Sequence, residues 1–205
     1  MAPGLRQFPT PRSAPNTNIP SPSEAKMRTL ILMRHAKTEA NNVMGDKARE
    51  LTTRGQQEAA VAGLAMKPLG VAHVLCSTST RTRQTFDWLG LRTPDGDAVP
   101  VEFMDALYFG GTDDMLQRIG EIDDAVSTLL VIGHAPTIPG LSAELASASA
   151  GREADQILCH FPTSTFSTFS IPKTWAELAD GDFSGVQIMD IDRPARGRTA
   201  ARTSI

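Results

Sequence analysis

Short apolar runs recur along most of this 205-residue chain, and segments of mixed polarity separate them. In the most apolar runs, at residues 30–33 and 129–132, the apolar residues are continuous rather than alternating, which is typical of strands that are buried on both faces of a parallel sheet. Pro162 separates the apolar run at residues 157–161 from the one at residues 165–171. The runs predict strands at residues 28–33, 71–76, 99–103, 128–132, 157–161, 165–171 and 186–191.

The segments between these runs carry helix signals. Thr53 and Gln56 have the T-x-x-Q spacing of a capping box, and Thr112 precedes two aspartates that stabilise the positive end of a helix dipole. Strands that alternate with helices favour an α/β fold, a three-layer α/β/α sandwich with a mostly parallel central sheet. Helices are predicted at residues 53–66, 80–89 and 112–122, and a fourth follows the loop at 133–139 and ends near residue 145.

The two ends of the chain differ from its middle. Residues 1–26 hold six of the fourteen prolines and many hydroxyl and amide side chains, so they offer too little apolar surface to offset the entropy of ordering. This segment is predicted to be disordered. Residues 192–205 hold four arginines and predict a basic, flexible tail. Residues 27–191 have the length of one domain.

Composition excludes several classes of function. The net charge of −3 gives no reason to expect nucleic acid or a membrane surface as a partner, and no apolar run approaches the roughly 20 residues that span a bilayer. The first residues lack the apolar segment of a secretory signal, so we expect a cytoplasmic protein. Cys76 and Cys159 are far apart and form no CxxC motif, which predicts two buried thiols rather than a zinc site or a disulfide.

Three predicted strands end in residues that can bind phosphate. Arg34 and His35 follow the first strand, the hydroxyl-rich and arginine-containing segment 77–83 follows the second, and His134 follows the fourth. The carboxyl ends of parallel strands share one edge of a sheet, where α/β folds bind ligands. Guanidinium groups match phosphate bidentately, and a neutral imidazole can attack phosphorus. Although each segment alone also fits an ordinary strand and loop, together they predict a phosphate pocket that contains histidine.

The sequence predicts no cofactor for this pocket. It contains no Walker loop and no aspartate-rich metal signature, so we expect the arginines to supply the positive charge that a metal ion supplies elsewhere. The other two histidines, His73 and His160, are expected to be packing or surface residues.

The motifs around these residues resemble those of the histidine phosphatase superfamily, which has the phosphoglycerate mutase-like fold. RHAKTEAN, at residues 34–41, resembles that family's R-H-G-x-T-x-x-N, with Ala36 in place of glycine. STSTRTRQT, at residues 77–85, resembles its S-x-x-x-R-A-x-x-T segment, and the pair at 133–134 resembles a later glycine-histidine pair. The resemblance covers about residues 28–190.

The resemblance implies a role for each site residue. It makes His35 the nucleophile and selects Arg81 over Arg83 as a phosphate ligand. The residues that it implies for binding the phosphoryl group or lining the pocket are Arg34, Arg81, His134, Thr38 and Asn41.

Within the superfamily the chain is most similar to the small bacterial signal-inhibitory phosphohistidine phosphatases. The segment ELTTRGQQEA, at residues 50–59, resembles their P-L-T-x-x-G segment. The resemblance implies that the substrate is phosphohistidine in a phosphorylated protein. A phosphatase of small phosphate esters on the same fold is the main alternative, and a mutase or a non-catalytic phosphate-binding adaptor fits the residues less well.

Asp105 is the candidate general acid. Mutases and many phosphatases of the superfamily carry a carboxylate in the region after the third strand, where Asp105 is the nearest one and Glu102 lies behind it. Asp105 also fits a role as a loop cap. An N–P bond breaks more readily than an ester bond because its leaving imidazole can be protonated beforehand, so a phosphohistidine phosphatase needs no strong acid.

Overall fold

The computed structural model describes residues 26–93, 95–149 and 153–194. Within them, six strands form one sheet in the order β3-β2-β4-β1-β5-β6. The pairs β3-β2, β2-β4 and β4-β1 are parallel, whereas β5 is antiparallel to both of its neighbours. The strands are β1 (Arg28–Arg34), β2 (His73–Ser77), β3 (Val101–Met104), β4 (Thr128–Gly133), β5 (Phe166–Ile171) and β6 (Gln187–Asp192).

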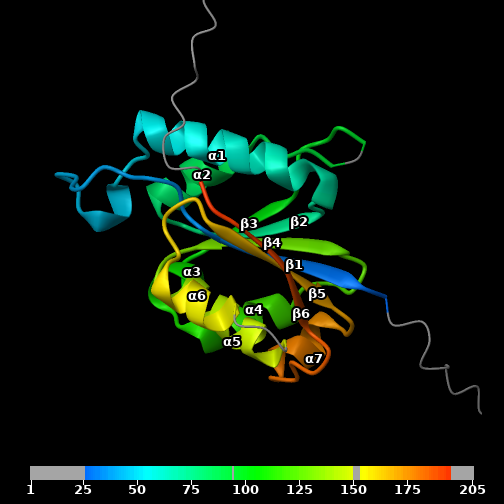
Figure 1. Ribbon diagram of the computed structural model, residues 1–205. Helices are drawn as coiled ribbons and strands as arrows, with labels where there is room; N and C mark the ends of the chain where they lie inside the picture. The colour runs from blue at the N-terminus through cyan, green and yellow to red at the C-terminus, as the bar shows by residue number, and fades with distance from the viewer. Residues whose placement is uncertain (1–25, 94, 150–152, 195–205) are drawn as a thin grey trace, which may run out of the picture.

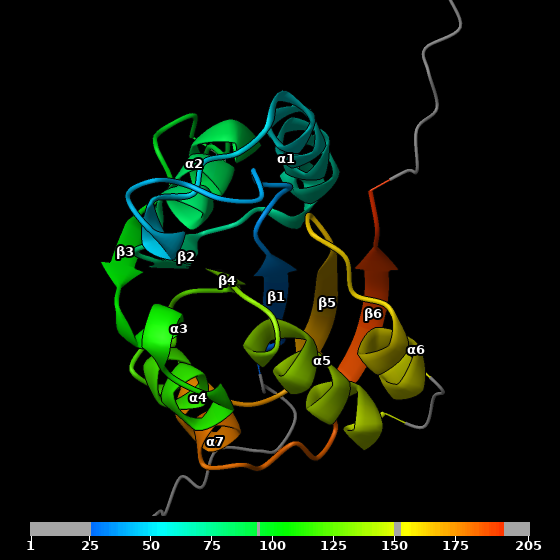
Figure 2. The same ribbon diagram turned by 90° about the vertical axis from the view of Figure 1, so that its left-hand side faces the viewer.

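Helices cover both faces of this sheet, which confirms the predicted three-layer α/β/α architecture (Figure 1). The first two helices lie on one face, and the later helices lie on the other, as Figure 2 shows from the side. The helices are α1 (Thr53–Met66), α2 (Thr80–Leu89), α3 (Ala106–Phe109), α4 (Thr112–Gly120), α5 (Thr137–Ala148), α6 (Glu153–Cys159) and α7 (Trp175–Ala179).

The continuous apolar runs of the strands fill two separate cores. In β1, Leu30 and Leu32 belong to the core under the later helices, whereas Ile31 and Met33 belong to the core under α1 and α2. All four side chains are fully buried. Coverage of β1 on both faces thus explains why these four successive residues are all apolar and do not alternate.

The prediction of a strand at 157–161 is wrong, because α6 occupies most of this segment. Ile157 and Phe161 are buried, whereas the three residues between them, including Leu158, are exposed, and a spacing of four is helical rather than extended. The strand prediction considered only the short apolar run and not the acidic residues before it, such as Glu153, which form the first turn of α6. The expected burial of Cys159 is wrong for the same reason: its thiol is exposed, whereas Cys76 is buried.

Helices α1 and α4 begin at the predicted residues, Thr53 and Thr112, but the residue that caps each helix lies one position earlier. Thr52 rather than Thr53 caps α1, since its side chain accepts a hydrogen bond from the Gly55 amide. Gly111 is the first residue of the α4 cap, and its amide donates to the Asp114 carboxylate at 2.8 Å.

The predicted N-terminal segment, apart from residue 26, and the tail beyond residue 194 lie outside the described residues, so their predicted disorder stays a prediction. Of the helices in the described ranges, none is both long and apolar enough to cross a membrane.

Candidate active site

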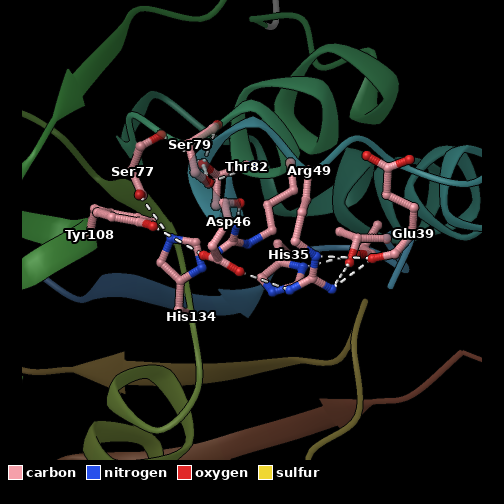
Figure 3. A network of polar contacts seen from close by, with 12 residues as sticks. His35, Glu39, Asp46, Arg49, Ser77, Ser79, Thr82, Tyr108 and His134 are labelled. Atoms are coloured by element: carbon pink, nitrogen blue, oxygen red, sulfur yellow. Dashed lines mark hydrogen bonds and ion pairs between the residues drawn. The ribbon is translucent and has the colours of Figure 1, made fainter. Parts of the chain in front are cut away.

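The register of β1 and β4 brings two histidines together at the carboxyl edge of the sheet. Arg34 pairs with Gly133, and the amide of His35 donates to the Gly133 carbonyl at 3.0 Å. The next residue after Gly133 is His134, and the centroids of the two imidazole rings lie 5.3 Å apart. Parallel pairing of these strands thus produces the juxtaposition that their sequence positions predict (Figure 3).

His35 is held as a neutral imidazole with a defined tautomer. Its Nδ1 lies 2.8 Å from the carbonyl oxygen of Ala36, so Nδ1 carries the proton and Nε2 keeps a free lone pair. The side chain is 7% exposed. Burial, together with smaller effects of the nearby His134, Arg81 and Arg34, lowers the pKa of His35 to about 3. A neutral Nε2 is the form of histidine that can act as a nucleophile.

His134 is oriented by a hydroxyl and an aromatic ring. Its Nε2 lies 2.8 Å from Oγ of Ser77 at the end of β2, and the Tyr108 ring stands edge-on to it at 5.5 Å between centroids. Burial, and then the charge of Arg81, lower the pKa of His134 to about 4. In the free protein this imidazole is therefore also neutral at physiological pH.

Two arginines line the same edge. Arg34 donates from Nη1 to the Phe161 carbonyl at 2.9 Å, and Arg81 donates from Nη1 and Nη2 to Asp46 at 2.7 and 3.0 Å. Three nitrogens of this cluster, Nε of Arg34, Nε of Arg81 and Nδ1 of His134, are buried and lack a partner among the described residues. Buried polar groups without a partner are costly, and phosphoryl oxygens could satisfy such donors.

The hydroxyl-rich segment before Arg81 fixes the start of α2. Ser79 caps the helix, and Thr82 donates through its hydroxyl to the Ser77 carbonyl at 2.7 Å. Thr85 donates to the Arg81 carbonyl at 2.6 Å and accepts from the Ala36 amide at 3.0 Å. The hydroxyl groups of this motif therefore connect the first turn of α2 to the loop that carries His35.

The structure brings Thr38 into this network but not Asn41. Thr38 is buried, and its hydroxyl accepts a hydrogen bond from Nη2 of Arg49 at 2.7 Å. Asn41 is exposed, and its side chain makes no hydrogen bond to the described part of the chain. A role for Asn41 in lining the pocket stays a prediction.

Comparisons with known proteins give the family. The family description "Histidine phosphatase superfamily (branch 1)" matches residues 30–108. An uncharacterised protein of Mycobacterium tuberculosis, Rv1276c, is 37% identical over 73% of this chain and 93% of its own length. The chain belongs to the histidine phosphatase superfamily.

Solved structures of this superfamily agree with that assignment. One is named "Putative Phosphohistidine Phosphatase SixA" from Nakamurella multipartitia; it is 34% identical, covers 83% of this chain and 98% of its own, and has a TM-score of 0.73. A second structure, named "putative phosphohistidine phosphatase SixA", comes from Agrobacterium tumefaciens and is 23% identical. The match covers 82% of this chain and 99% of that chain with a TM-score of 0.63, which supports the fold. The chain is therefore similar to SixA proteins and has a phosphatase fold.

Asp105, the candidate acid of this histidine phosphatase, lies at the rim of the site. Its carboxylate is 61% exposed, accepts from Nζ of Lys47 at 2.6 Å and accepts from the hydroxyl of Thr78. The hydrogen bond from Lys47 holds the pKa of Asp105 below its usual value. Asp105 is thus ionised at neutral pH. Glu102 pairs with His73 at 2.8 Å and is not in contact with this group.

Sequence reasoning gave no individual role to four polar residues of the network. Ser77 had a signal, since it ends a predicted strand and opens the S-x-x-x-R motif. The others come from segments whose path the strand pattern does not determine: Asp46 from a short 3-10 helix (Asp46–Ala48), Arg49 just after it, and Tyr108 from α3.

The free enzyme is expected to keep both site imidazoles neutral from pH 8 down to about pH 5.5, because their pKa values lie near 3 and 4. NMR of the histidine ring protons in phosphate-free buffer would check this. The variants His35→Asn and His134→Asn assign the signals, because each variant lacks the signals of one ring. In the wild-type protein the chemical shifts of these two rings should not change between pH 8 and about pH 5.5. A midpoint above pH 6 for either ring would contradict the prediction.

The same shift has a consequence for stability. Below pH 6.5 the unfolded chain binds protons at these histidines that the folded protein does not bind, so the free energy of unfolding must fall as pH falls. For His35 alone the loss is on the order of 3 kcal/mol by pH 4. In urea unfolding, His35→Asn should therefore flatten the pH dependence of stability between pH 4 and 6.5.

Proposed function

We propose that this protein is a metal-independent phosphohistidine phosphatase that forms a covalent phosphohistidine on His35. The observation that carries the proposal is the buried, neutral His35, with Nδ1 tied to the Ala36 carbonyl and Nε2 free, beside two arginines and a second histidine. The relative that is 34% identical and bears a phosphohistidine phosphatase name supports the choice of substrate.

In the first chemical step, the lone pair of His35 Nε2 forms a bond to phosphorus, and the bond from phosphorus to the leaving group breaks with its electron pair on the leaving group. Arg34, Arg81 and His134 hold the equatorial phosphoryl oxygens. Phosphoryl transfer depends mainly on positioning and charge stabilisation, which these groups supply without bond changes of their own.

In the second step, water attacks the phosphoryl group on His35. A new P–O bond forms, the P–N bond breaks, and its electron pair returns to Nε2, so that His35 is regenerated and inorganic phosphate leaves with the protons of water. Nδ1 keeps its hydrogen bond to the Ala36 carbonyl in both steps, which preserves the tautomer for the next turnover.

The state of Asp105 supports a phosphoramidate rather than an ester as substrate. An ester leaving group needs a proton as it departs, and Asp105, ionised and paired with Lys47, is poorly suited to provide one. The imidazole of phosphohistidine can be protonated before it leaves. Asp105 remains the candidate general acid for esters, the alternative substrates of this site.

A substrate panel tests the proposal. The purified full-length protein should dephosphorylate a phosphohistidine protein or peptide with a kcat/KM at least about a hundredfold above its value for sugar phosphates and phosphoglycerates. Higher kcat/KM for a small ester would favour the ester phosphatase instead. Phosphate binding without turnover of any substrate would favour the adaptor.

Activity is expected to survive removal of metal ions. The described residues contain no group of three histidine, cysteine or acidic side chains that could hold a metal ion, and the arginines supply the positive charge. Turnover after dialysis against EDTA should equal turnover before it within error. A loss that Mg²⁺ restores would refute the metal-independent mechanism.

A further inference from the structure

The carboxylate of Asp46 lies inside the polar network of the pocket (Figure 3). Its Oδ2 accepts hydrogen bonds from Nη2 of Arg81 and from the Tyr108 hydroxyl, both at 3.0 Å. Its Oδ1 accepts from Nη1 of Arg49 at 3.0 Å. The Tyr108 ring in turn stands edge-on to His134. Asp46 is thus fixed beside two of the groups that hold the phosphoryl group in the proposed mechanism.

Asp46 places a negative charge where a dianion has to bind. The hydrogen bond from Arg49 lowers the pKa of Asp46 to about 2, with further contributions from Tyr108 and Arg81. An ionised carboxylate cannot donate a proton, and it repels phosphoryl oxygens that approach Arg81. Asp46 therefore weakens phosphate binding unless the substrate brings a positive group with it.

Phosphohistidine brings such a group, and a phosphate ester does not. When the phosphohistidine ring is protonated, the imidazole nitrogen that is not bonded to phosphorus carries an N–H and the ring is cationic. The bridging oxygen of an ester has neither a proton nor a positive charge. The Asp46 side chain is 55% exposed, so a substrate side chain can reach it from solvent.

We propose that Asp46 is a specificity-determining residue: its carboxylate accepts a hydrogen bond from the leaving imidazole of phosphohistidine and so favours N–P over O–P substrates. This inference rests on the function proposed above. It gives Asp46 and Asp105 different roles: Asp46 favours phosphohistidine as substrate, and Asp105 is the candidate general acid for esters.

The step needs no proton transfer at Asp46. The lone pair of His35 Nε2 forms the new P–N bond, and the bond from phosphorus to the substrate nitrogen breaks, leaving its electron pair on that nitrogen. The proton on the other ring nitrogen stays in its hydrogen bond to Asp46. The cationic ring thereby leaves as neutral imidazole, and the carboxylate stabilises the protonated ring before the bond breaks.

A purely positional role for Asp46 would give a different result. If the carboxylate only held Arg81 in place, its loss would slow all substrates equally and would weaken the binding of inorganic phosphate. If its charge selects the leaving group, its loss slows phosphohistidine alone and strengthens phosphate binding.

The test compares Asp46→Asn with Asp105→Asn and with Asp155→Asn, which removes an exposed carboxylate on α6. For each full-length variant, kcat/KM is measured with a phosphohistidine peptide and with p-nitrophenyl phosphate, and inorganic phosphate is used as an inhibitor. Thermal unfolding checks that each variant is folded. Tyr108→Phe, which removes one hydrogen bond to the same oxygen, serves as a second variant.

Asp46→Asn is expected to lower kcat/KM for phosphohistidine by about 10- to 100-fold, not to lower kcat/KM for the ester, and to tighten inhibition by phosphate. Tyr108→Phe should shift the substrate ratio in the same direction, Asp105→Asn in the opposite direction, and Asp155→Asn not at all.

Equal losses on both substrates with weaker phosphate inhibition would overturn the proposal and make Asp46 a positioning residue for Arg81. An unchanged substrate ratio would overturn it as well. A wild-type protein that hydrolyses only the ester would overturn the proposed function together with this inference, whereas loss of the Asp46 effect alone would leave the proposed function intact.

Discussion

Replacing His35 with alanine is expected to reduce turnover of every phosphorylated substrate by at least about a thousandfold. The proposed reaction passes through a bond between Nε2 and phosphorus, and no other side chain in the cluster is equally placed to form it. The Nε2 of the nearest imidazole, His134, is engaged by Ser77. Steady-state kinetics with a phosphohistidine peptide and with p-nitrophenyl phosphate would measure the loss.

The matched control for this variant is His160→Ala, because His160 is exposed and lies outside the site. It should keep wild-type activity. Rapid acid-free quenching and mass spectrometry should also find one phosphoryl group on the peptide that contains His35 in the wild-type protein. Retention of even a tenth of the activity in His35→Ala would reject the nucleophile assignment.

Much of the fold could be predicted because burial on both faces leaves a simple signature. The four residues before Arg34, at 30–33, are all apolar, and the structure places alternate residues of this run in two different cores. The same signature fails at α6, since a run as short as that around Ile157 fits a buried strand and one face of a helix equally well. Only the exposed Leu158 distinguishes the two, and exposure is not visible in the sequence.

The site could be predicted where it depends on strand ends, and not where it depends on loops. Arg34 ends β1, and His35 and His134 directly follow β1 and β4, so parallel pairing is enough to bring them to one edge. Asp46 and Tyr108 meet only because a 3-10 helix and a short helix of four residues fold back over that edge. Sequence spacing contains no information about such a contact between residues 62 positions apart.

A second large effect is expected at Gly55, which lies in the first turn of α1 where the helix packs on the loop after His35. A Cβ atom at this position would lie 2.0 Å from the carbonyl oxygen of Lys37 and 2.9 Å from its carbonyl carbon. That carbonyl cannot easily move away, because it accepts a hydrogen bond from the amide of Thr52, the α1 cap. This contact explains in physical terms why the segment at 50–59 needs a glycine after L-T-x-x.

Gly55→Ala is therefore expected to destabilise the protein by about 3 kcal/mol, even though alanine is the better helix former. Gly140→Ala is the matched control, because Gly140 also lies in a helix, α5, and a Cβ there would meet nothing closer than the Thr112 methyl at 3.6 Å. The control should leave the free energy of unfolding within about 1 kcal/mol of wild type. A small increase is expected, because alanine is more stable than glycine inside a helix. Urea unfolding of both variants would measure the difference. If Gly55→Ala were as stable as Gly140→Ala, the close approach of α1 to the His35 loop could not be the reason for the glycine.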